Sequence, residues 1–184
     1  ALRWIDPDFK TLKAGLYRIP VGLNQLELIE YILDAKPAEF KITFIEGSQW
    51  RDWWLQLQQH PHIVKTLTQS ADKALTPYKQ NGSIEGLLFP DTYVFYAGTK
   101  DIDIIQQAHK RMADVLSQAL TTINSYYLNI ALNDYEILTL ASIVEKETAI
   151  VDEMPLVSSV FYNRLKKKMR LQTDPTVIYG LGEN

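Results

Sequence analysis

The chain has 184 residues, of which 46% are hydrophobic and 22% charged, and its net charge is −3 at pH 7. These values indicate a soluble globular protein with a buried core, and they exclude an intrinsically disordered chain or one built from membrane-spanning helices. The negative balance gives no case for a nucleic-acid partner, because neutralising phosphates takes a surplus of clustered Lys and Arg.

The first predicted elements are a short strand and a helix. Residues 15–19 have the composition of a strand that Pro20 ends. Asn24, followed three residues later by Glu27, is typical of an N-cap with its reciprocal partner. The helix is expected to run to about Asp34 and to stop before Pro37, because the residue before a proline disfavours helical backbone.

A second strand and an aromatic helix come next. Residues 40–45 alternate large apolar and polar side chains over most of their length, as a half-buried strand does. Ser48 is the expected N-cap of a helix that runs to about Gln59, and its apolar stripe consists of Trp50, Trp53, Trp54 and Leu57. Aromatic residues at this spacing are usually core. The alternative is a platform on which sugar rings stack.

The region after this helix predicts less regular structure. His60-Pro-His62 fits a helix-ending turn, and two histidines without a nearby third ligand, in a chain without cysteine, do not predict a metal site. Residues 63–76 are expected to form a weak helix. Residues 81–86 have the composition of a turn, and residues 87–96 form an extended apolar segment that Pro90 interrupts.

Three helices are predicted in the second half of the chain. Apolar residues recur at helical spacing over residues 101–120, and residues 135–148 form an almost continuous apolar helix. A third helix, over residues 156–167, runs into the basic cluster at 166–170. That cluster is expected to be a solvated helix end, and the alternative is a contact to an anionic polymer. The elements up to about residue 46 predict a small α/β lobe, and those after it predict a larger, mainly helical lobe with a few strands. The expected fold class is therefore α+β.

Two glutamates at the end of the apolar helix are the candidate catalytic groups. Glu145 and Glu147 point about 200° apart on a helix, so they cannot share one site. Glu147 lies one turn beyond Ile143 and Val144 on one flank of the apolar stripe, and Glu145 lies on the other flank. A carboxyl held against apolar neighbours stays protonated more readily, and it can then donate a proton to a glycosidic oxygen. The alternative is that both are ordinary glutamates at a helix end. Periodicity alone does not choose between Glu145 and Glu147 as the catalytic group.

Three segments closely resemble the endolytic murein transglycosylase family, also called YceG-like. They are Ala-Ser-Ile-Val-Glu-Lys-Glu-Thr at 141–148, Val-Phe-Tyr-Asn-Arg-Leu at 160–165 and Met-Arg-Leu-Gln-Thr-Asp-Pro-Thr-Val-Ile-Tyr-Gly at 169–180. Shorter stretches at 12–18, 44–47 and 85–93 resemble the family in the same order. The resemblance therefore spans nearly the whole chain.

The resemblance implies a bacterial lyase that cuts within peptidoglycan glycan strands, between N-acetylmuramic acid and N-acetylglucosamine. The family's catalytic glutamate maps onto Glu147, with Glu145 as the alternative. The implied mechanism needs no cofactor and no metal. Glu147 first acts as general acid on the bridging oxygen and then as general base on the C6 hydroxyl, which closes a 1,6-anhydro ring.

Polar residues in and near the third segment are the expected substrate-binding groups. Asn163, Gln172, Thr173, Asp174 and Tyr179 can hydrogen-bond the acetamido and hydroxyl groups of the glycan. The alternative for residues 173–176 is a turn in which Asp174 caps the next segment.

The resemblance also implies domains and a location. Residues 1–46 correspond to a LysM-like region truncated at its N-terminus, and residues 47–184 to a catalytic domain truncated at its C-terminus. We expect this segment to be soluble and its parent to be anchored to the inner (cytoplasmic) membrane by a single helix, with the catalytic part facing the periplasm. The expected partners are peptidoglycan strands, with cell-wall synthases as a further possibility, in the service of cell-wall biogenesis and glycan-length control.

Two other functions compete with this prediction. A muramidase-type hydrolase would cleave the same bond with a second carboxylate that activates water, and Glu85 or Asp91 would supply it. Structural turn roles are favoured for both of these residues. A non-catalytic peptidoglycan-binding module would hold glycan through the LysM-like region and the tryptophans, with Glu147 incidental.

Overall fold

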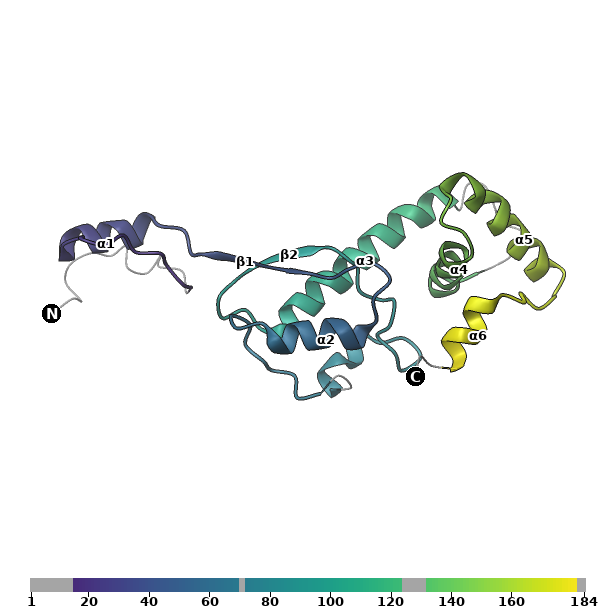
Figure 1. Ribbon diagram of the computed structural model, residues 1–184, viewed down its shortest axis with the longest axis horizontal. Helices are drawn as coiled ribbons and strands as arrows, with labels where there is room; N and C mark the ends of the chain where they lie inside the picture. The colour runs from purple at the N-terminus through teal and green to yellow at the C-terminus, as the bar shows by residue number, and fades with distance from the viewer. Residues whose placement is uncertain (1–14, 70–71, 124–131, 182–184) are drawn as a thin grey trace. The chain divides into compact units, whose positions relative to one another are not determined.

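A computed structural model describes residues 15–69, 72–123 and 132–181 (Figure 1). Within these ranges the chain combines helices with a two-stranded sheet, which confirms the predicted α+β class. It divides into two compact units, Ala1–Met112 and Ala113–Asn184, which are described separately below. The predicted boundary after residue 46, between a LysM-like region and a catalytic domain, stays a prediction.

The first helix confirms its predicted cap. α1 (Gln25–Asp34) begins after Asn24, whose Oδ1 accepts the backbone N–H of Leu26 and of Glu27, each at 3.0 Å. The Glu27 carboxylate accepts the N–H of Asn24 in return, at 2.8 Å. These reciprocal bonds satisfy amide groups that a helix start otherwise leaves unpaired.

The predicted strand over residues 15–19 is wrong. This segment has no regular secondary structure; its Leu16 carbonyl accepts one hydrogen bond, 2.7 Å long, from the N–H of Ala38. Gly15 permits a close approach to Pro37, since a Cβ there would lie 2.7 Å from the Pro37 Cβ.

β1 (Glu39–Thr43) pairs with β2 (Thr92–Tyr96) as an antiparallel ribbon, with Glu39 opposite Tyr96 and Thr43 opposite Thr92. The strand predicted over 40–45 is therefore confirmed, but it ends two residues early. The extended segment after Pro90 is confirmed as β2. Alternate side chains of this ribbon face the core, because successive residues of a strand point to opposite sides.

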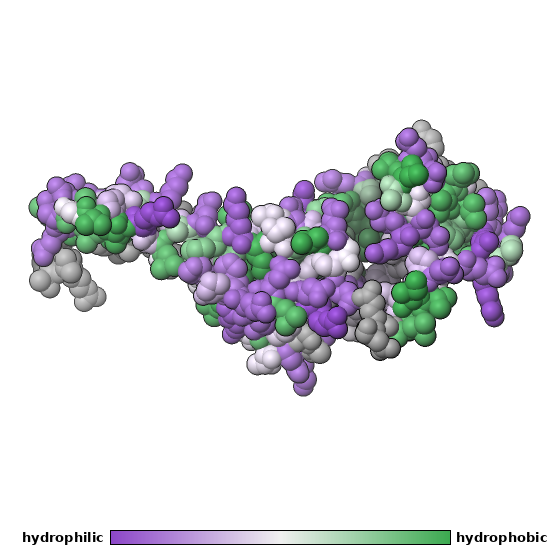
Figure 2. Space-filling view, viewed as in Figure 1, coloured by the Kyte–Doolittle hydropathy of each residue, from purple (hydrophilic) through white to green (hydrophobic). Residues whose placement is uncertain are grey.

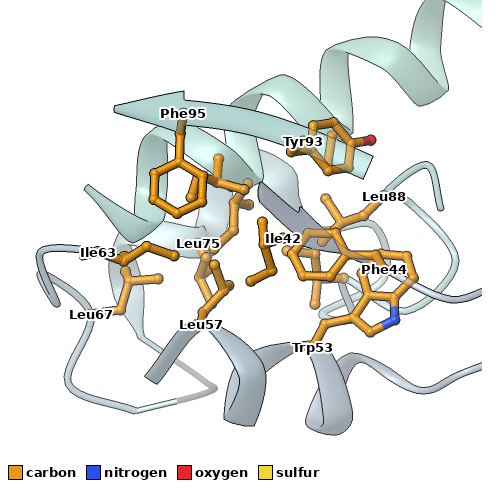
Figure 3. Close-up of a cluster of buried hydrophobic side chains, with 14 residues drawn as sticks. Ile42, Phe44, Trp53, Leu57, Ile63, Leu67, Leu75, Leu88, Tyr93 and Phe95 are labelled. Carbon is orange, nitrogen blue, oxygen red and sulfur yellow. The ribbon is translucent and has the colours of Figure 1, made fainter. Parts of the chain in front are cut away.

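The core of the first unit lies between this ribbon, α2 (Trp50–Gln59) and the start of α3 (Asp101–Ile123). The Trp53 and Phe44 rings stack with centroids 4.5 Å apart and planes 7° apart. Trp50 and Trp54 pack against the same cluster, which confirms the core interpretation of the aromatic stripe. Figure 3 shows ten of its members: Ile42, Phe44, Trp53, Leu57, Ile63, Leu67, Leu75, Leu88, Tyr93 and Phe95.

The start of α2 differs from the prediction. Gln49 occupies the N-cap position rather than Ser48, and its N–H donates to the Asp52 carboxylate at 3.2 Å. The Ser48 hydroxyl instead donates to the Ile45 carbonyl and accepts the indole N–H of Trp53. Ser48 therefore fixes the core tryptophan rather than the helix end.

The weak helix predicted over residues 63–76 is wrong for the described part of that range. Val64 forms a parallel bridge with Lys100, and a 3-10 helix, η3 (Lys73–Tyr78), covers only its end. The buried Asp101 carboxylate accepts the N–H groups of Thr66 and Leu67. Backbone donors that a helix would have used are bonded to a distant side chain instead.

The amphipathic helix predicted over 101–120 is confirmed as α3. Its first turns place Ile104, Ile105 and Ala108 in the core of the first unit with no exposed surface. None of the described helices combines the length and the apolar character needed to cross a membrane.

The second unit contains α4 (Asp134–Glu147), a short 3-10 helix η4 (Val151–Glu153), α5 (Met154–Lys166) and α6 (Asp174–Leu181). α4 and α5 confirm the helices predicted over 135–148 and 156–167. Their shared core is small and consists of Ile143, Val144 and Phe161, with Leu140, Met154, Val157 and Leu171 packed around it. The helix α6 was not predicted.

Candidate active site

Glu147 is the last residue of α4, and its side chain is exposed. The helix ends there because Thr148 adopts extended backbone, with φ −145° and ψ 133°, although its N–H still reaches the Val144 carbonyl at 3.2 Å. Ile143 and Val144, one turn earlier, are buried against Phe161. The apolar stripe thus anchors α4, and the helix end presents the Glu147 carboxyl at the surface of the unit.

Thr173 connects the segment at 169–180 with the segment at 141–148. Its hydroxyl donates a hydrogen bond to Oε1 of Glu147, across 26 positions of the chain. The Thr173 side chain is only 4% exposed, whereas most polar residues of this unit are exposed. The contact joins the end of α4 to the residue that precedes α6.

The loop between α5 and α6 is held in a specific shape. The Arg164 guanidinium donates to the Leu171 carbonyl, and Gln172 then has a left-handed backbone with φ 52°. The Thr173 carbonyl accepts both the N–H of Thr176, at 3.3 Å, and its hydroxyl, at 2.7 Å. Hydrogen bonds to backbone carbonyls at Leu171 and Thr173 therefore fix the direction in which the Thr173 side chain points.

The chain after Glu147 is ordered by the next residue. The Thr148 hydroxyl donates to Oε2 of Glu153 at 3.0 Å and accepts the N–H of Ile150 at 3.1 Å. Both bonds fold the turn from α4 into η4. Thr148, which follows the candidate catalytic Glu147, is thus bonded to Glu153 and Ile150.

The other predicted substrate-binding residues surround this contact less directly. Asn163 is exposed on α5, Gln172 is exposed in the loop, and Asp174 is the exposed first residue of α6. In the described ranges, no hydrogen bond joins these three side chains to Glu147. Tyr179 lies on α6 and is 70% exposed. Thr173 is therefore the predicted residue that the structure bonds to Glu147.

Helix α6 presents its apolar side chains to solvent. Val177, Ile178 and Leu181 are all more than half exposed, and Figure 2 shows hydrophobic surface over this helix. Burial of these three side chains therefore does not hold α6 in place. Its first turn begins with Asp174 and Pro175, residue types that suit a helix start. The alternative of a plain turn at residues 173–176 is replaced by this first helical turn.

Glu145 and the two carboxylates of the rival mechanism have other surroundings. Glu145 is exposed on α4. The Glu85 carboxylate accepts the N–H of Trp50, at 3.1 and 3.3 Å to its two oxygens, and so completes the start of α2. Asp91 accepts the N–H of Thr92 at 2.7 Å, at the start of β2. Glu85 and Asp91 therefore each accept a backbone N–H at the start of a helix or strand, in keeping with the structural roles favoured for them.

Two chemical points follow for the site. The predicted apolar enclosure of the Glu147 carboxyl is not supplied by the described residues, because the side chain is exposed. Among residues 15–69, 72–123 and 132–181, no three histidine, cysteine, aspartate or glutamate side chains are grouped so that they could hold a metal ion.

Comparison with known proteins shows which family this chain resembles. A model of the YceG-like family matches residues 2–184. A protein of Bacillus subtilis (strain 168) named endolytic murein transglycosylase is 38% identical over 194 residues, which cover 94% of this chain and 52% of that protein. A Streptococcus pneumoniae protein (serotype 2, strain D39) of the same name is 38% identical over 110 residues, covering 58% of this chain and 19% of the relative.

A solved structure of a YceG-like protein from Listeria monocytogenes is also similar. The TM-score is 0.53 at 25% sequence identity, with 94% of this chain and 62% of that chain covered. The chain spans about half the length of the Bacillus relative and a smaller part of the Streptococcus one. With its family match covering residues 2–184, the chain belongs to the YceG-like family.

Proposed function

We propose that the protein to which this chain belongs is an endolytic murein transglycosylase, a lyase that cleaves glycan strands of peptidoglycan between N-acetylmuramic acid and N-acetylglucosamine. The observation that carries the proposal is the hydrogen bond between Thr173 and Glu147. It joins two of the three segments in which the chain closely resembles the family. The names of the Bacillus and Streptococcus relatives support the same activity.

In the proposed reaction, one carboxyl group acts twice. Protonated Glu147 donates its proton to the bridging oxygen while positive charge develops at C1 of the muramic residue. The resulting carboxylate then takes the proton of the C6 hydroxyl on the same sugar. That oxygen bonds to C1 and closes the 1,6-anhydro ring. No water is consumed, so the leaving strand and the anhydro end account for all atoms.

The exposed position of Glu147 suits a polymeric substrate. A carboxyl at the end of α4 can reach an internal bond of a strand without the strand being threaded into an enclosed cavity. We place Asn163, Gln172, Asp174 and Tyr179 in contact with acetamido and hydroxyl groups on either side of the cleaved bond. Their side chains lie on α5, the following loop and α6, the elements that flank Thr173.

The setting of the whole protein is also proposed from the family resemblance. Residues 1–46 would belong to a LysM-like region that holds glycan, and residues 47–184 to the catalytic domain. The protein would be anchored to the inner membrane and face the periplasm, where nascent strands are made. Cell-wall synthases are the proposed protein partners.

The test is mass spectrometry of fragments released from purified peptidoglycan by the whole protein and by its Glu147→Gln variant. We expect 1,6-anhydro ends from the wild type and none from Glu147→Gln, which keeps the shape of the side chain but cannot carry the proton. Glu145→Gln is the matched control on the same helix. It should release the same products as the wild type, and its inactivity beside an active Glu147→Gln would reverse the assignment.

The products also separate the competing functions. Reducing muramic ends would identify a hydrolase and require a second carboxylate. Binding of glycan without any released fragment, in both wild type and Glu147→Gln, would identify a binding module.

A further inference from the structure

We propose that Thr173 is a positioning residue for Glu147 rather than a substrate-binding group, and that Arg164 sets its geometry through the Leu171 carbonyl. This inference rests on the proposed function of Glu147. The three residues form one path: Arg164 on α5 holds the loop, the loop delivers Thr173, and the Thr173 hydroxyl holds the Glu147 carboxyl.

Burial is the first argument. Among the five predicted substrate-binding residues, Thr173 alone is buried, and Asn163, Gln172, Asp174 and Tyr179 are exposed. A side chain that is 4% exposed and already bonded to a carboxylate has little surface left for a sugar. Its buried position fits a group that contacts Glu147 from the protein interior rather than from the substrate side.

The construction of the loop is the second argument. Gln172 has φ 52°, a left-handed conformation that non-glycine residues rarely adopt and that costs free energy unless neighbouring contacts maintain it. The bond from Arg164 to the Leu171 carbonyl precedes it, and the bonds from Thr176 to the Thr173 carbonyl follow it. Polar contacts on both sides thus hold a turn that directs Thr173 toward α4.

The chemistry of a hydroxyl is the third argument. A threonine hydroxyl donates one hydrogen bond and accepts others, whereas a carboxyl group donates only when it is protonated. Thr173 can therefore donate to the Glu147 carboxylate and accept from the Glu147 carboxylic acid. One uncharged side chain keeps the carboxyl oriented in both protonation states, which an acid that later acts as base requires. A lysine or arginine in this place would hold only the ionised form.

The test compares Thr173→Val with Thr173→Ser in the whole protein, by initial rates on soluble uncrosslinked glycan strands. Valine keeps the shape of threonine but lacks the hydroxyl, and serine keeps the hydroxyl. We expect Thr173→Val to lower kcat roughly tenfold or more, since small misplacements of a catalytic group are costly, with KM nearly unchanged. Thr173→Ser should restore most of the rate.

Arg164→Gln tests the second part of the path. If Arg164 acts through Thr173, the double variant Arg164→Gln, Thr173→Val should lose no more rate than the larger of the two single losses. Losses that multiply would show that Arg164 acts independently and would overturn that part.

Other outcomes decide the main inference. A raised KM with unchanged kcat in Thr173→Val would show substrate binding instead, and a wild-type kcat would overturn positioning. Circular dichroism checks the fold, and Thr173→Ala replaces Thr173→Val in the comparison if the latter does not fold. An inactive Glu147→Gln beside a fully active Thr173→Val would refute only this inference. An active Glu147→Gln would refute the catalytic role proposed for Glu147, on which this inference rests.

Discussion

The carboxylate of Asp101 accepts the backbone N–H of Thr66 at 3.0 Å to each of its two oxygens. Asp101 is the first residue of α3 and has no exposed surface, and it also accepts the N–H of Leu67 at 3.0 Å. A buried charge is tolerated only when such donors surround it. This side chain therefore ties the irregular segment after α2 to the start of the longest helix.

Asp101→Ala should destabilise the first unit by about 3 kcal/mol, because the N–H groups of Thr66 and Leu67 would lose their acceptor while buried or partly buried. Tryptophan fluorescence during urea unfolding measures this unit specifically, since all four tryptophans lie before residue 55. The matched control is Asp103→Ala in the same helical turn. That exposed carboxylate accepts one longer bond, 3.3 Å from the Lys100 N–H, so its loss should cost under about 1 kcal/mol. Equal losses would contradict the special role of Asp101.

Leu57→Ala should lower the free energy of unfolding of the first unit by about 2–5 kcal/mol, through lost burial and a cavity. Leu57 has no exposed surface and lies in the core between α2 and the two strands (Figure 3). Leu55→Ala is the control two residues away on α2, because Leu55 is 47% exposed. The same fluorescence measurement should show a much smaller loss for it. A larger effect of Leu55→Ala would mean that α2 is oriented differently.

Glu85→Gln should reduce stability by up to about 1 kcal/mol and leave glycan cleavage intact. The change weakens the acceptor for the Trp50 N–H, which completes the start of α2. Product analysis by mass spectrometry should still find anhydro ends. A folded Glu85→Gln that binds glycan but releases no fragments would instead support a second catalytic carboxylate. Asp91→Asn is the companion variant and should behave in the same way.

The stability of the first unit should depend on His60 at mildly acidic pH. Burial lowers the pKa of His60 below its ordinary value of 6.5, and the charges of His62 and Lys65 lower it further. Below pH 6.5 the unfolded chain therefore binds a proton that the folded chain resists. Stability should be unaffected by this group above that pH and should fall as the pH decreases through 6.5 toward the lower, folded-state pKa.

His60→Gln should flatten the dependence of the unfolding free energy on pH as the pH falls below 6.5. Lys65→Gln should flatten it in part, because one cause of the lowered pKa is removed. Urea unfolding at a series of pH values measures both slopes. Identical slopes in the wild type and His60→Gln would show that other groups cause the acid sensitivity.

Several elements of this protein could be read from short stretches of sequence. The cap of α1 is a reciprocal pair three residues apart, Asn24 with Glu27, and such bonds form within one helical turn. The periodicities that predict α3, α4, α5 and β1 are equally local. For the same reason the predicted bounds agree with the structure to within about two to three residues where such signals exist.

Other elements were decided by residues far away in the chain. The helix expected over 63–76 is absent from the described part because Asp101, 35 positions beyond Thr66, takes its backbone donors. The segment expected to be a strand over 15–19 lies outside the two-stranded sheet of β1 and β2. Composition alone could not show either outcome, because both depend on hydrogen-bond partners that lie elsewhere in the chain.

The candidate site divides in the same way. By itself the sequence determined which helix ends carry carboxylates, and that residues 171–180 hold polar groups suited to a glycan. The tertiary structure decided that Thr173 is buried and bonded to Glu147, and that α6 begins directly after it. A hydrogen bond across 26 positions depends on the packing of α4 against α5 and on the shape of the loop that Arg164 holds, and neither is written in a local pattern.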